Sequence, residues 1–158
     1  MACCNVGANK PEDFWNYYAW GETQTKREYT VDTYLYDIGD FDREIAGTDH
    51  DAATANWGAP WQMPSKVQIQ ELLDNTTSIG TTQNGVKGRK FTGNNGESIF
   101  LPFAGQMTTT LYNTTSGYYW SSTAGGSITR PNLLAISMTY SGMLDLMYSY
   151  GLPIRPVR

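Results

Sequence analysis

The stretch from Asp51 to Leu73 constrains the fold of this chain more than any other, because it holds two clear helix starts. Asp51 can cap the first helix, since its carboxylate can accept the free N–H groups of a first helical turn. The Ala-rich turns that follow stop at Gly58, and glycine commonly ends helices. Ser65, with Gln68 three residues later, matches a capping box and predicts the start of a second helix.

The second predicted helix has a single apolar stripe. Ile69, Leu72 and Leu73 fall at positions i, i+3 and i+4, which share one helical face that must pack against another element. The link between the helices adds further large apolar groups at Trp57, Trp61 and Met63. We therefore expect a two-helix core element, with the rest of the chain forming the sheet on which it packs.

The composition is typical of one globular, turn-rich domain over residues 1–158. A net charge of −4 argues against nucleic acid as a partner, because phosphate binding needs clustered Lys and Arg. We expect the small basic group at Lys87, Arg89 and Lys90 to be a solvated hairpin face. No apolar run approaches the length of a membrane span. The abrupt start of the chain suggests the C-terminal domain of something longer.

Several features argue against a metal site, a cofactor or an enzyme. His50 is the only histidine, and Cys3 and Cys4 are adjacent, so neither a His-pair zinc site nor a disulfide staple is expected. No nucleophile-elbow motif accompanies His50. A calcium hypothesis rests on clustered carboxylates, although EF-hand spacing is absent; they are Asp37, Asp40, Asp42, Asp49 and Asp51. We predict a non-enzymatic protein with no metal and no cofactor.

The remaining segments predict irregular chain and short strands. The aromatic run over residues 14–20 favours a strand in the hydrophobic core or at its edge, with a stacking platform for bases or sugars as the alternative. Asn84-Gly85 predicts a type I′ hairpin turn. Short strands are expected over residues 86–92, 98–103, 118–122, 133–140 and 144–157, and residues 29–50 are expected to be irregular.

A series of short blocks runs through nearly the whole chain in a fixed order. They are Cys4-Asn5-Val6-Gly7-Ala8, Pro11-Glu12-Asp13, Tyr17-Tyr18-Ala19-Trp20-Gly21-Glu22, Asp51-Ala52-Ala53-Thr54-Ala55-Asn56-Trp57-Gly58, Trp61-Gln62-Met63-Pro64-Ser65, Glu71-Leu72-Leu73, Thr82-Gln83-Asn84-Gly85, Ser98-Ile99-Phe100-Leu101-Pro102, Gly117-Tyr118-Tyr119-Trp120-Ser121-Ser122 and Arg155-Pro156-Val157. Together these blocks resemble the Fibrobacter succinogenes major paralogous domain, which occurs in surface and secreted proteins of Bacteroidetes-type bacteria and their phages.

This resemblance implies an α+β, C-type-lectin-like fold, with two helices packed on small twisted antiparallel β-sheets and a loop-rich second half. Some members look like the variable proteins of diversity-generating retroelements, which display a mutagenised C-terminal segment for ligand binding. Here that segment would be residues 123–154. The chain departs from the family pattern near Tyr148-Ser149, where an Arg is often found, and at Pro153, where a Ser is often found.

Residues 133–140 and 143–150 carry apolar side chains on both alternation phases. Either both faces are buried in a sandwich, or one phase exposes Met, Leu and Tyr as an interaction surface. The candidate contact residues are Arg130, Asn132, Thr139, Tyr140, Met143, Asp145, Met147, Tyr148 and Tyr150. If Tyr148 and Tyr150 are contacts, their replacement by Ala should leave thermal stability nearly unchanged.

The expected function is therefore a ligand-displaying domain on a cell surface or phage particle, which binds a protein or glycan on another cell. One alternative is a structural, fimbria-like surface subunit with no specific ligand. Another is a calcium-dependent lectin, although its metal-binding triplets are absent and Arg130-Pro131-Asn132 puts a cation where a carboxylate would belong.

Overall fold

The computed structural model describes the backbone of residues 1–158 and all side chains other than that of Asp40. Its helices are η1 (Val31–Thr33), η2 (Ile38–Asp40), α1 (Ala52–Trp57) and α2 (Lys66–Asn75). Its strands are β1 (Thr76–Gln83), β2 (Val86–Gly93), β3 (Ser98–Pro102), β4 (Gln106–Met107), β5 (Leu111–Tyr112), β6 (Gly117–Trp120), β7 (Asn132–Ile136) and β8 (Ser141–Asp145). None of the described helices is long and apolar enough to cross a lipid bilayer.

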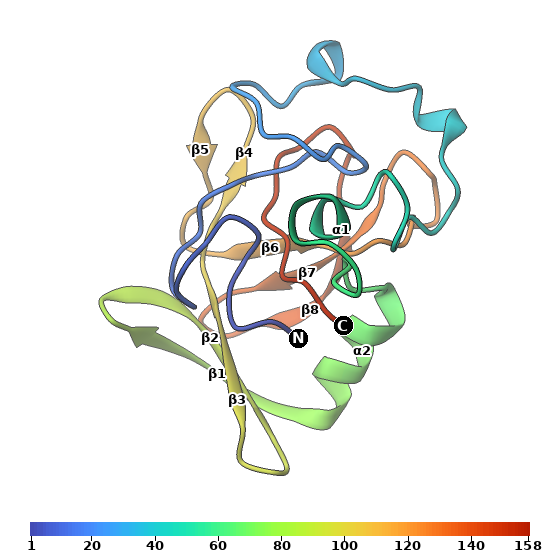
Figure 1. Ribbon diagram of the computed structural model, residues 1–158. Coiled ribbons are helices and arrows are strands. Elements are labelled where there is room, and N and C mark those ends of the chain that lie inside the picture. The colour runs from blue at the N-terminus through green and yellow to red at the C-terminus, as the bar shows by residue number, and fades with distance from the viewer.

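The strands form three small antiparallel sheets, with the orders β1-β2-β3, β4-β5 and β6-β7-β8. The β6-β7-β8 sheet crosses the middle of the molecule, with α1 on one side and the long β1-β2-β3 hairpin sheet and α2 on the other (Figure 1). The expected α+β class, with two helices and small antiparallel sheets, is confirmed.

Both predicted helix starts are confirmed. Asp51 Oδ1 accepts the N–H groups of Ala53 and Thr54 at 2.8 and 3.1 Å, and α1 ends at Gly58. In the capping box of α2, Ser65 and Gln68 each accept the other's backbone N–H.

The Asp51 side chain does more than cap a helix. Its second oxygen, Oδ2, accepts the N–H groups of Gly47 at 2.8 Å and Met63 at 2.9 Å. The carboxylate is fully buried, so these backbone donors replace the water that its charge would otherwise need. One side chain therefore joins the loop before α1, the start of α1 and the link to α2.

Strand β7 is buried on both faces and separates the two main cores. Leu133 and Ala135 face the first core, whereas Leu134 and Ile136 face the second. The first core contains Val6, Tyr18, Trp20, Phe41, Ile45, Ala52, Ala53, Met63, Trp120, Ala124, Leu152 and Ile154, and the second contains Ile69, Phe91, Leu101, Phe103 and Tyr119. For β7, the interpretation that both apolar phases are buried is confirmed.

The strand expected over residues 144–157 is wrong in its bounds. Ser137 N–H donates to the Tyr140 carbonyl at 2.8 Å, and this tight turn starts β8 at Ser141. After Asp145 the chain leaves β7, and residues 146–157 form no further strand; they join other segments through isolated bridges and single backbone hydrogen bonds. One of these bridges pairs Leu152 with Tyr18, so the C-terminal segment fills a seam between other elements.

Arg89 corrects the prediction of a solvated basic hairpin face. Lys87 and Lys90 are exposed, but the Arg89 side chain is buried and donates to Ser78 Oγ at 2.9 Å and to the Ser137 carbonyl at 3.0 Å. Burial lowers the pKa of Arg89 from its ordinary value. Arg89 therefore ties β1 and β2 to the turn before β8.

Substitution Asp51→Asn should lower the free energy of unfolding by about 3 kcal/mol or more, because the new amide would turn its NH₂ group toward backbone N–H donors. Urea unfolding of the variant measures this change. The matched control is Asp42→Asn at an exposed aspartate, for which a change within about 0.5 kcal/mol is expected. Equal effects of the two substitutions would contradict the role given to Asp51.

Candidate ligand-binding surface

The surface around β8 exposes several large apolar side chains. Strand β8 is an outer strand, and its Leu144 is 48% exposed although its partner Leu133 is buried. The Tyr140 ring folds over Gly142, where an added Cβ would clash with the Tyr140 hydroxyl. Because Gly142 and Leu144 share one face of the strand, Tyr140 and Leu144 lie on the same side of β8.

The turn before β8 is held firmly in place. Ser137 Oγ accepts the backbone N–H groups of Thr139 and Tyr140 at 3.4 and 3.1 Å. Arg89 donates to the carbonyls of Ser137 and Met138, and Gly80 lies so close to Met138 that a Cβ would clash with its carbonyl oxygen. The exposed side chains of Met138, Thr139 and Tyr140 thus stand on an anchored turn.

At the other end of β8, Arg130 and Asp145 form an ion pair. The Arg130 Nε to Asp145 Oδ1 distance is 2.6 Å, and both side chains are about half exposed. Such an exposed pair contributes at most about 1 kcal/mol to stability. Neighbouring Asn132 instead turns inward and donates to the Ala124 carbonyl at 2.9 Å.

Three of the other candidate contact residues pack against the cores. Tyr148 and Tyr150 lie against the first core, and the Tyr148 ring is 4.4 Å from that of Tyr34. Met143 packs against the second core. Because of this packing, we now expect replacement of Tyr148 or Tyr150 to lower stability, contrary to the expectation from the sequence. Met147, in contrast, is 37% exposed.

The nine candidate residues are not all exposed to solvent. The exposed members divide between the turn, with Thr139 and Tyr140, and the far end of β8, with Arg130, Asp145 and Met147. Two exposed apolar residues, Met138 and Leu144, were missed among the candidates. Alternation alone cannot find them, because Met138 lies in the turn before β8 and the exposure of Leu144 depends on β8 being an outer strand.

The described side chains do not assemble a cluster of metal ligands. No three His, Cys, Asp or Glu side chains among them lie together as a metal site requires. The His50 ring packs against Tyr36 and Phe41, with centroid distances of 4.9 and 4.4 Å. Of the aspartates in the calcium hypothesis, Asp51 already uses its carboxylate to accept backbone N–H groups. The side chain of Asp40 lies outside the described residues.

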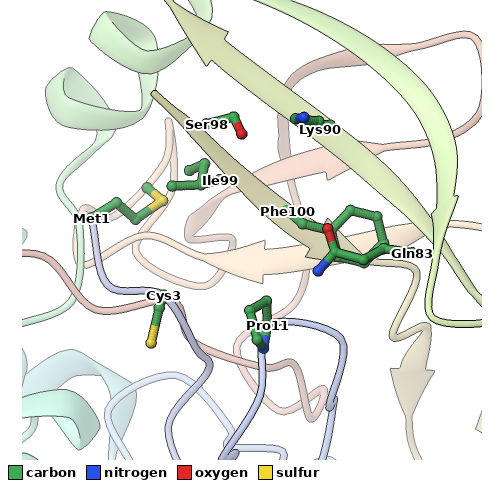
Figure 2. Close-up of a pocket in the computed structure, with 8 residues that line it drawn as sticks. All are labelled: Met1, Cys3, Pro11, Gln83, Lys90, Ser98, Ile99 and Phe100. Atoms are coloured by element: carbon green, nitrogen blue, oxygen red, sulfur yellow. The ribbon is translucent and has the colours of Figure 1, made fainter. Parts of the chain in front are cut away.

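A hollow of about 280 Å³ lies between the N-terminal segment and β3. Figure 2 shows Met1, Cys3 and Pro11 on one side of it, and Ser98, Ile99 and Phe100 of β3 on the other. Cys3 and Cys4 are both free thiols. Burial and the neighbouring Cys3 raise the pKa of Cys4 to about 11, which keeps this thiol protonated and unreactive.

Comparison of the chain with protein-family models, with curated proteins and with solved structures gave no match. The resemblance given by the ordered sequence blocks therefore stays a prediction. The exposed side chains of the chain itself are therefore the guide to what it can bind.

Substitution Tyr148→Ala should lower the free energy of unfolding by about 2 kcal/mol, because it removes a ring that packs between Tyr34 and the first core. Its neighbour offers a control: Met147→Ala, at a more exposed side chain, should cost less than about 1 kcal/mol. Urea unfolding of both variants checks the order. A neutral Tyr148→Ala would mean that Tyr148 is a freely exposed contact residue after all.

Proposed function

We propose that this chain is a non-enzymatic ligand-binding domain with a C-type-lectin-like fold, which displays its late segment on a cell surface or phage particle. Its partner is a protein or glycan on another cell. The observation that carries the proposal is the group of exposed apolar side chains on and beside β8, two of which, Met138 and Tyr140, stand on the anchored turn. We call this group the β8 surface; it comprises Met138, Tyr140, Leu144 and Met147.

The magnitudes favour the apolar side chains as the source of affinity. Covering a half-exposed Tyr or Leu contributes about 1 kcal/mol, given that full burial contributes about 1.5–3 kcal/mol. Loss of Tyr140 and Leu144 together would then weaken binding by more than about tenfold. The Arg130–Asp145 pair lies at the rim, where charges govern specificity and association rate more than affinity.

The distribution of burial also supports the hypothesis of retroelement diversification. Within residues 123–154, the buried strand β7 and the packed tyrosines hold the cores together, whereas the β8 surface carries little of the packing. Changes at the exposed positions would therefore alter the ligand and leave the fold intact. A scaffold for variable binding needs its variable positions to be separate from the residues that stabilise the fold.

The calcium-dependent lectin is a weaker alternative. Arg130 carries no oxygen ligand and is paired with Asp145, so a cation stands where the lectin-type site would need a carboxylate. The fimbria-like structural subunit remains the second candidate, since an exposed outer strand such as β8 is also a natural site for polymerisation.

A fluorescent tetramer of the domain, titrated onto intact bacterial strains and a glycan array, tests the proposal. The wild-type domain should bind at least one strain or glycan, and the double variant Tyr140→Ser/Leu144→Ser should lose at least about tenfold in affinity. The matched control Val31→Ser/Leu35→Ser removes side chains of similar exposure from a different surface and should bind normally.

Each other outcome has a definite meaning in this experiment. Equal losses in both double variants would contradict the β8 surface as the binding site. Binding that disappears on addition of EDTA would favour the calcium-dependent lectin. Absence of any binding, together with polymerisation of the purified domain, would favour the structural subunit.

A further inference from the structure

A second surface with the properties of a ligand site contains none of the residues of the β8 surface. It is a groove of about 260 Å³, which we call the Trp15 groove. Two N-terminal segments and the β4–β5 hairpin form its walls; the main contributors are Phe14, Trp15, Tyr17, Lys26, Tyr29 and Leu111. Tyr29 N–H donates to the Thr108 carbonyl at 3.0 Å, which fastens these walls together where they run side by side (Figure 1).

The floor of the groove is rigid. Tyr17, Ala19 and Tyr29 form a small buried cluster, against which Met107 packs. The Tyr17 hydroxyl donates to the Ala104 carbonyl at 2.6 Å, and the Tyr29 hydroxyl donates to the Tyr17 carbonyl at 2.5 Å. Burial raises the pKa of Tyr29 to about 12, so this phenol stays protonated and keeps its bond.

Trp15 stands at the rim of the groove as an exposed aromatic platform. Its side chain is 64% exposed, and Phe14 stacks beneath it with a centroid distance of 5.6 Å and an interplanar angle of 24°. The next residue, Asn16, has a left-handed φ of 71°, which breaks the strand alternation and lets Tyr17 turn inward while Trp15 faces out. The chain thus holds a largely exposed indole on a supporting ring.

The groove is electrically neutral, although Lys26 lines it. Lys26 Nζ forms an ion pair with Glu22 at 2.8 Å and donates to the Thr33 carbonyl at 2.9 Å. Its charge is therefore compensated within the fold. Asn16 and Thr25 supply the other polar groups of the lining, and both are uncharged. These groups do not suit a phosphate or carboxylate ligand, which needs unpaired cations.

We propose that the Trp15 groove binds a neutral pyranose residue of a glycan, with the apolar face of the sugar ring on the Trp15 indole. A pyranose carries C–H bonds on its faces and hydroxyls around its rim. The faces can pack on an aromatic ring, and the hydroxyls can bond to uncharged groups such as the exposed Thr25 hydroxyl and the Asn16 side-chain oxygen; the Asn16 NH₂ group already donates to the Tyr18 hydroxyl at 3.4 Å. The site is independent of the β8 surface, because the two share no residue.

A proline-rich peptide is the nearest competitor, since such peptides also dock in aromatic grooves. Those grooves hold the peptide carbonyls with hydrogen-bond donors between the rings. Here the hydroxyls of Tyr17 and Tyr29 already donate to backbone carbonyls within the fold. These two hydroxyls are therefore not available to peptide carbonyls, which disfavours the proline-rich peptide.

Titration calorimetry with cellohexaose, mannohexaose and galactohexaose tests the proposal, with sialyllactose and a decaproline peptide as competing ligands. The wild-type domain should bind at least one neutral hexasaccharide. Trp15→Ala should weaken that binding at least tenfold, whereas Trp15→Phe, which keeps a flat ring, should retain most of it. Both variants should keep the thermal midpoint of the wild type, because the side chain is mostly exposed.

Two control variants distinguish the Trp15 groove from the rest of the exposed apolar surface. Leu35→Ala removes an equally exposed apolar side chain elsewhere, and Tyr140→Ser/Leu144→Ser alters the β8 surface; both should bind the sugar normally. The proposal is overturned if none of the hexasaccharides binds, if Trp15→Ala binds as well as wild type, or if only decaproline or sialyllactose binds. None of these results bears on the β8 surface, whose own test uses different variants.

Discussion

The arrangement of this molecule depends on the buried carboxylate of Asp51. Its two oxygens accept four backbone N–H groups, from Gly47, Ala53, Thr54 and Met63. Burial of a carboxylate without these donors would carry a large desolvation penalty. The loop, the start of α1 and the link to α2 must therefore come together around it. This places Ala53 and Met63 in the first core and leads the chain directly into α2.

Strand β7 extends this constraint to the late part of the chain. The first core lies on one of its faces and the second core on the other, so β7 can change little without disturbing both. Strand β8 is bonded to β7 along one side but packs less deeply, and the turn before it is fixed by Arg89. The exposed side chains of β8 and its turn are therefore held by a rigid backbone, and they contribute little to the stability of the fold. The Trp15 groove follows the same pattern, with a bonded floor below an exposed ring.

Local rules recovered the parts of the fold that are encoded locally. The cap at Asp51, the capping box at Ser65 and the Asn84-Gly85 turn depend on residues within a few positions of each other, and all three were predicted. The burial of Arg89 and Tyr148 depends on partners far along the chain, which a single sequence does not identify. The aromatic run 14–20 was expected to form a strand, which is wrong, because only Tyr18 forms an isolated bridge there. Its second half nevertheless lies in the core, and Trp15 is exposed.

A saturation scan of residues 130–150, scored by resistance of the displayed domain to protease, tests most directly whether folding and the exposed surface are separate. The exposed positions should accept most substitutions, polar ones included; they are Met138, Thr139, Tyr140, Leu144 and Met147. The buried residues of β7 should accept only apolar residues of similar size, and position 148 should accept only aromatic residues. If the exposed positions proved as intolerant as β7, they would be part of the core, and the separation of scaffold from surface would be wrong.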